Sequence, residues 1–179
     1  MTGLRQVENV GSMNLAVAWT TVWLMCGCAS SSVVQVATSL PADFVGSTPC
    51  DTLPRHFLKT PENAACECIQ WRLTFHLDDV SASRGAYTLV ATYGMSETNA
   101  PGFFQGGTKT EVTGQLTATI GSAGDLHGTV YHLQATDPAR SLSLIKIDDN
   151  LLHILNDDGH LLVGNDSWSY TLNRIPKQP

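Results

Sequence analysis

Three cysteines in the first half of the chain are the residues best suited to do chemistry. Cys66 and Cys68 are separated by one residue, and Cys50 precedes them by a segment that contains His56. Thiolates select soft ions such as Cu(I) and Zn(II) over hard cations, and a histidine nitrogen can complete such a site. The spacing therefore allows a metal centre at Cys50, Cys66 and Cys68, with copper as the candidate ion.

The same cysteines could instead form a structural disulfide. A bond between Cys50 and Cys66 would close a loop of about 15 residues and stabilise the fold by about 3 kcal/mol in the loop-entropy model. Cys68 could equally be the partner of Cys50, because alternate residues of an extended chain project to the same side. Either pairing leaves one thiol over, and that thiol could exchange with the disulfide as a redox switch.

The sequence carries no enzyme signature. It has no G-x-S-x-G elbow, no P-loop and no dinucleotide-binding fingerprint. The histidines outside the cysteine segment follow neither the HxH nor the HExxH spacing of zinc ligands; they are His76, His127, His132, His153 and His160. We therefore expect a protein that is not an enzyme and that has no cofactor other than a possible copper ion.

An apolar segment near the N-terminus has the character of an export signal. Residues 13–25 contain no charge, and the only cation before them is Arg5. The segment is shorter than the roughly 20 apolar residues that a helix needs to cross a bilayer. This pattern predicts a cleaved signal peptide rather than a permanent membrane span.

The residues that follow this segment resemble a bacterial lipobox. Gly27 stands directly before Cys28, whereas the larger Met25 stands before Cys26. The resemblance implies a lipoprotein signal peptide over residues 1–27, a lipid on Cys28 and a polar tether over residues 28–40. Ala29 after the cysteine implies an outer-membrane location by the sorting rule of enteric bacteria. An ordinary secretory signal is the alternative, and either signal exports the domain into a compartment where disulfides persist.

The remaining sequence, residues 41–176, predicts one all-β domain. Apolar residues alternate with a period of two in segments bounded by Gly, Asp and Asn. These segments predict strands over residues 69–77, 86–93, 109–120, 128–134, 141–147, 151–155, 160–163 and 168–174. Eight short strands with tight turns at 148–150 and 156–159 favour a small antiparallel up-and-down barrel of the lipocalin-like kind.

One helix and one long loop interrupt the strand pattern. Residues 52–59 predict a short helix in which Asp51 caps the first turn. The Gly-rich loop 98–108 carries Phe103 and Phe104, which we expect to plug one end of the barrel rather than line an open mouth. We expect a packed interior, with Trp71 and Trp168 in the core or at the rim, made of Leu73, Phe75, Leu89, Leu116, Val130, Leu142, Leu144, Ile154, Leu162 and Leu172.

The net charge argues against nucleic acid as a partner. The chain has a formal charge of −6, and no segment of the predicted domain is strongly basic. A protein that binds nucleic acid neutralises phosphates with clustered Lys and Arg. The expected partners are the membrane, through the lipid anchor, and a signalling protein of the cell envelope.

Five segments in this order resemble the copper-resistance lipoproteins of the NlpE type, in their N-terminal lipocalin-like domain. The segments are the lipobox at Cys28, FVGSTPC at 44–50, CECIQWRLTF at 66–75, YTLVATY at 87–93, and the closing hairpin from LNDDG at 155–159 to YTLNR at 170–174. That family has a CxxC in its first loop, whereas this chain has a CxC and an insertion between Cys50 and Cys66.

The resemblance implies a role in copper homeostasis or in sensing envelope stress. A bound metal ion or a changed disulfide state would reshape the loop from Cys50 to Cys68, and the anchored domain would report this change to a partner. The alternative is a structural or small-ligand-binding surface lipoprotein whose disulfide only holds the fold together.

Overall fold

The computed structural model describes residues 42–78 and 83–176. The predicted signal peptide, Cys28 and the whole predicted tether over residues 28–40 lie outside the described residues. The elements in chain order are β1 (Ala42–Pro49), α1 (Thr52–Leu58), β2 (Cys68–Leu77), β3 (Arg84–Gly94), the 3-10 turn η1 (Phe104–Gly106), β4 (Thr108–Ala123), β5 (Leu126–Ala135), β6 (Ser141–Asp148), β7 (Leu151–Leu155) and β8 (Thr171–Arg174).

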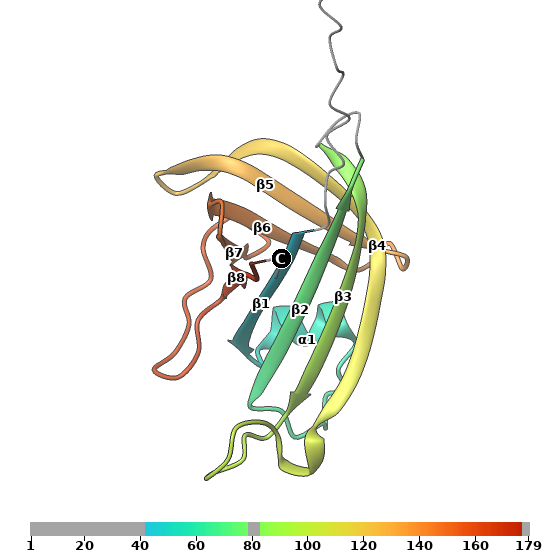
Figure 1. Ribbon diagram of the computed structural model, residues 1–179, viewed down its shortest axis with the longest axis vertical. Helices are drawn as coiled ribbons and strands as arrows, with labels where there is room; N and C mark the ends of the chain where they lie inside the picture. The colour runs from blue at the N-terminus through green and yellow to red at the C-terminus, as the bar shows by residue number, and fades with distance from the viewer. Residues whose placement is uncertain (1–41, 79–82, 177–179) are drawn as a thin grey trace, which may run out of the picture. The chain divides into compact units, whose positions relative to one another are not determined.

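The eight strands form a closed antiparallel barrel in which every strand pairs with the next along the chain. Strand β8 returns to pair with β1 and closes the sheet (Figure 1). This arrangement confirms the up-and-down barrel and the short helix that the sequence predicts. Within the described residues, no helix is long and apolar enough to cross a membrane.

The eight strands are not quite the eight that the alternation predicts. Residues 42–49 form β1, whereas residues 160–163 form only an isolated bridge, between Leu161 and Leu155. The side chain of Asn156, just before this segment, explains the difference. The Asn156 carboxamide oxygen accepts hydrogen bonds from the backbone N–H groups of Asp158 and His160 (3.1 and 2.8 Å), which makes the predicted turn.

A second side-chain turn shortens the last strand. The predicted strand 168–174 begins only at Thr171. The Asn165 carboxamide oxygen accepts from the N–H groups of Ser167 and Trp168 (3.0 and 2.9 Å), so these groups bond locally instead of joining a ladder. Residues 160–163 and the start of the predicted last strand are therefore loop.

The inward-facing residues form one packed core. Phe44 faces Leu73 across β1 and β2, and Leu73 faces Leu89 across β2 and β3. Of the predicted interior, Leu73, Phe75, Leu89, Leu116, Leu142, Leu144, Ile154 and Leu172 are buried in this core, and Leu162 packs against it half-buried. The interior is therefore filled by side chains, as expected for a barrel of this size.

Val130 is the exception among the predicted interior residues. It is buried, but it belongs to a separate cluster with Ala123, Ile145 and Leu155. Its strand neighbours Tyr131 and Leu133 belong to or pack against the main core, and pairing places Leu133 opposite Leu116. Because Val130 is an odd number of residues from Tyr131, it projects to the other face of the sheet.

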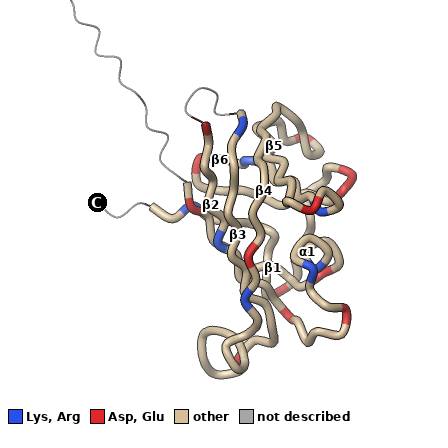
Figure 2. The backbone as a smooth tube through the Cα atoms, turned by 90° about the vertical axis from the view of Figure 1, so that its right-hand side faces the viewer, with Lys and Arg blue, Asp and Glu red and all other residues tan. Residues whose placement is uncertain are grey.

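A buried polar pair lies among the apolar side chains of the core. The Trp71 indole N–H donates to Thr48 Oγ1 (2.8 Å), and the Thr48 hydroxyl donates to the Pro49 carbonyl oxygen (3.1 Å). Trp71 is therefore a core residue, whereas Trp168 is half-buried. On the outside, Figure 2 shows Lys and Arg positions interspersed with Asp and Glu along the backbone.

Gly46 lies where β1 and the start of β8 approach each other closely. A Cβ atom at this position would clash with the Thr171 carbonyl oxygen and lie 2.8 Å from the Leu172 side chain. We therefore expect Gly46→Ala to lower the free energy of unfolding by about 2–3 kcal/mol, because the clash involves backbone that cannot move away alone. Urea denaturation measures this change. The neighbouring variant Ser47→Ala is the control, and a loss as large in Ser47→Ala would contradict the explanation.

Candidate functional site

One end of the barrel is covered by residues 50–67, which we call the cap. The cap joins β1 to β2 and contains α1, which Figure 1 shows lying behind β2 and β3. Phe57 and Leu58 of α1 belong to the main core, and Leu53 packs against it. The burial of this apolar face explains why the short helix forms, since isolated helices of this length are unstable in water.

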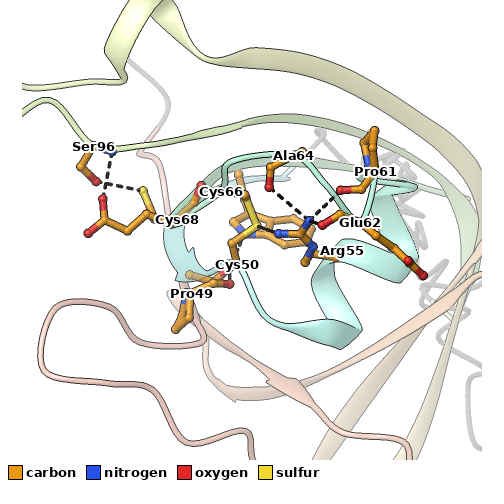
Figure 3. Close-up of a disulfide and its surroundings, with 12 residues drawn as sticks. Pro49, Cys50, Arg55, Pro61, Glu62, Ala64, Cys66, Cys68 and Ser96 are labelled. Carbon is orange, nitrogen blue, oxygen red and sulfur yellow. Dashed lines mark hydrogen bonds between the residues drawn. A yellow bond between two sulfur atoms is a disulfide. The ribbon is translucent and has the colours of Figure 1, made fainter.

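A disulfide between Cys50 and Cys66 joins the two ends of the cap. Their Cα atoms are 5.8 Å apart (Figure 3), a normal distance for a disulfide. The first of the two pairings that the sequence allows is therefore present. The bond lies at the base of α1 and keeps the cap in place over the barrel end.

Arg55 holds the inner part of the cap together. Its Nη2 donates to the carbonyl oxygens of Pro61, Glu62 and Ala64 (2.6, 2.9 and 3.3 Å; Figure 3). One guanidinium thus satisfies several carbonyl groups of a loop that has no regular secondary structure. The sequence gives no signal for this role, because it depends on how the loop folds back over the helix.

Cys68 is the free cysteine among residues 42–78 and 83–176, and its side chain points away from the disulfide (Figure 3). Its Sγ lies 3.6 Å from Ser96 Oγ, and the neighbouring Glu67 carboxylate accepts from the Ser96 N–H (3.0 Å). Burial raises the pKa of the Cys68 thiol, and the hydrogen bond to Ser96 opposes this only in part. Since the thiolate is the nucleophile, we expect Cys68 to react slowly at neutral pH.

The oxidised cap does not fit the three-cysteine metal site. Cys50 and Cys66 are bonded to each other, so only Cys68 remains as a thiol ligand. His56 is exposed on α1. Among residues 42–78 and 83–176, no three His, Cys, Asp or Glu side chains are grouped closely enough to hold a metal ion. A copper site at these cysteines would require reduction of the disulfide.

Tyr170 and Arg140 both attach the cap to the rest of the barrel through polar contacts. The Tyr170 hydroxyl donates to the Asp51 carboxylate, and Arg140 Nη1 donates to the Phe57 carbonyl oxygen (2.9 Å). The expectation that Asp51 caps α1 is wrong, because its side chain makes no capping hydrogen bond. The carboxylate turns to Tyr170 instead, and burial together with this contact raises the Tyr170 pKa.

The aromatic pair of the Gly-rich loop does not plug the barrel as expected. Phe104 is 62% exposed. Phe103 is buried, but it packs within its own loop, where it lies against Gly94 and Gly107. A turn with positive φ angles at Gln105, Gly106 and Gly107 follows the two phenylalanines. The barrel end is covered by α1 rather than by this loop.

No family model, curated protein or solved structure matches this chain significantly. The resemblance to the NlpE-type lipoproteins therefore stays a prediction from the five sequence segments.

Tyr87 and Tyr170 are a matched pair of buried tyrosines with opposite hydrogen-bonding states. The Tyr87 hydroxyl has no partner, and burial raises its pKa to about 12. We expect Tyr87→Phe to raise the free energy of unfolding at pH 7 by about 1 kcal/mol, and Tyr170→Phe to lower it by about 1–2 kcal/mol. Denaturant unfolding measures both values, and a loss in Tyr87→Phe would contradict the assignment.

The same pair predicts a dependence on alkaline pH. An unfolded tyrosine ionises near pH 10, whereas folded Tyr87 keeps its proton until about pH 12. The unfolded state therefore binds fewer protons in this window, and stability falls as the pH rises from about 10 to about 12. Tyr87→Phe should reduce that fall.

Proposed function

We propose that the chain is an exported bacterial envelope lipoprotein, anchored through Cys28, whose capped barrel serves as a binding module. The observation that carries this proposal is the Cys50–Cys66 disulfide. Disulfides persist in oxidising compartments outside the cytoplasm. The apolar segment 13–25 and the Gly27–Cys28 pair independently favour export and lipid attachment.

Two features favour a partner or ligand that binds outside the barrel. The interior is filled by core side chains, and Phe57 and Leu58 of the cap belong to the same cluster. A lipocalin-like carrier would need an open mouth and an empty interior. The outer surfaces of the cap and of the adjoining loops are therefore the proposed contact surface, and an envelope protein is the proposed partner.

The lipid anchor can be tested with the full chain in a bacterial host. We expect radiolabelled palmitate to enter the protein and the label to be lost in Cys28→Ser. The matched control is Cys26→Ser, which removes the neighbouring cysteine and should keep the label. Label retained in Cys28→Ser, or lost in Cys26→Ser, would sink the assignment of the anchor.

A copper- or stress-sensing role is the second candidate. The observation in its favour is the free thiol of Cys68, two residues from the disulfide-bonded Cys66. Reduction would release two further thiols into the same segment and create the set of soft ligands that Cu(I) prefers. The resemblance to NlpE-type lipoproteins also supports this role.

Counting free thiols separates the two roles. The full chain is extracted from membranes with and without added copper, alkylated in one sample while folded and in a parallel sample after unfolding, and weighed by intact mass. We expect one reactive thiol, unaffected by copper, and none in Cys68→Ser, which would indicate a purely structural disulfide. Three reactive thiols that copper protects would instead assign Cys50, Cys66 and Cys68 to sensing.

A further inference from the structure

A cavity between the cap and the turn that joins β5 to β6 has a charge opposite to that of the chain. Its volume is about 660 Å³, and its wall carries three cationic side chains and two carboxylates, namely Arg55, Lys59, Arg140, Glu62 and Asp137. With His56 neutral, the wall is net positive, whereas the whole chain has a formal charge of −6. Figure 2 shows basic positions on α1 with acidic positions close by.

Two polar atoms of residues in this wall have no hydrogen-bond partner. Thr60 is only 8% exposed, and its Oγ1 is unpartnered. Arg140 Nε also has no hydrogen bond, although it forms an ion pair with the Asp137 carboxylate at 3.6 Å. Buried polar groups are nearly always bonded, and a bound ion is one of the usual reasons for an exception. Both atoms can donate, but they are almost completely covered, so an acceptor in the cavity reaches them only after a small shift of the wall.

Lys59 stands at a position that normally belongs to glycine. It ends α1 in the left-handed conformation, with φ 56° and ψ 37°. Glycine is the usual residue there because it has no Cβ penalty. Lys59 instead places an ammonium group on the cavity wall, where it pairs with Asp137 (Nζ to Oδ2, 2.9 Å). Lys59 therefore adds a positive charge to the cavity wall at the cost of a strained backbone conformation.

Stabilisation of the C-terminal end of α1 explains only part of the charge and hydrogen bonding in the cavity wall. Cations near a helix C-terminus interact favourably with its carbonyl groups, and Arg140 Nη1 bonds the Phe57 carbonyl oxygen in this way. This role accounts neither for the unpartnered Thr60 hydroxyl nor for Arg140 Nε. It also does not account for a lysine where glycine would satisfy the same backbone at lower strain.

We propose that this cavity binds a small oxyanion, either phosphate or a carboxylate. The anion accepts hydrogen bonds from the Thr60 hydroxyl and the Arg140 guanidinium, and Lys59 supplies the opposite charge. Hydrogen bonds between guanidinium and an oxyanion are short, strong and directional. Asp137 already forms an ion pair of this kind with Lys59, so the bound anion adds to or competes with that pair.

The test is titration of the full chain in detergent with sodium phosphate, with sodium acetate and, as the non-oxyanion control, with sodium chloride at matched ionic strength. Calorimetry and the thermal midpoint are the readouts. We expect saturable binding and a rise in Tm with phosphate, with acetate or with both, and neither effect with chloride. The first two arms show which oxyanion the cavity prefers.

Two substitutions link the binding to this cavity without endangering the fold. Thr60→Val removes the unpartnered hydroxyl at constant shape, and Lys59→Gly relieves the left-handed backbone. Each should leave the Tm without ligand unchanged or higher and raise the Kd of the anion about tenfold, as expected for loss of one charged hydrogen bond or ion pair. Lys109→Ala, an exposed cation on β4, is the control for loss of charge and should bind as the unmodified chain does.

Either of two results would overturn the proposal. One is a response to phosphate and acetate no larger than the response to chloride. The other is oxyanion binding that Thr60→Val and Lys59→Gly leave unchanged. Because neither substitution affects Cys28 or the disulfide, failure here is separable from failure of the lipoprotein assignment.

Discussion

Closure of the barrel depends on a narrow seam. Strand β8 has four residues, and it pairs with β1 only at Phe44 and Val45. The neighbouring contact at Gly46 is so close that no side chain fits there. Two pairs of residues alone would not hold a sheet closed, so closure relies on the inward-facing core and on Tyr170, whose hydroxyl joins the chain before β8 to Asp51 at the cap.

The alternation of apolar residues predicts most of this fold because each strand buries one face only. It predicts the bounds of the central strands to within a few residues. Eight strands of this kind can pair the backbone groups at both sheet edges by closing into a barrel. It fails where side chains compete with the ladder. Asn156 and Asn165 bond neighbouring backbone groups, so the apolar residues near them lie in turns instead of strands. It also assigns Val130 to the barrel interior, although the register places this residue on the outer face of the sheet, where it is buried in a second cluster.

The cap is predictable only in part from its residues. The spacing of Cys50 and Cys66 suggests their disulfide, and the sequence also gives the bounds of α1 closely. The sequence does not predict that Arg55 and Arg140 hold the cap in place, because their partners are backbone carbonyl oxygens that any residue could supply. The same is true of the orientation of Cys68, which depends on the position of Ser96 in a distant loop.

The order of the strands affects how the barrel folds when the chain is synthesised or exported with its N-terminus first. Cys50 and Cys66 lie on the connection between the first two strands, so they can be oxidised while most of the sheet is still missing. The partner of β1 on its other side, β8, is the last strand to appear. Until then β1 offers unpaired backbone groups at an open edge, which is a template for aggregation. A holding chaperone that shields this edge would matter most during that interval.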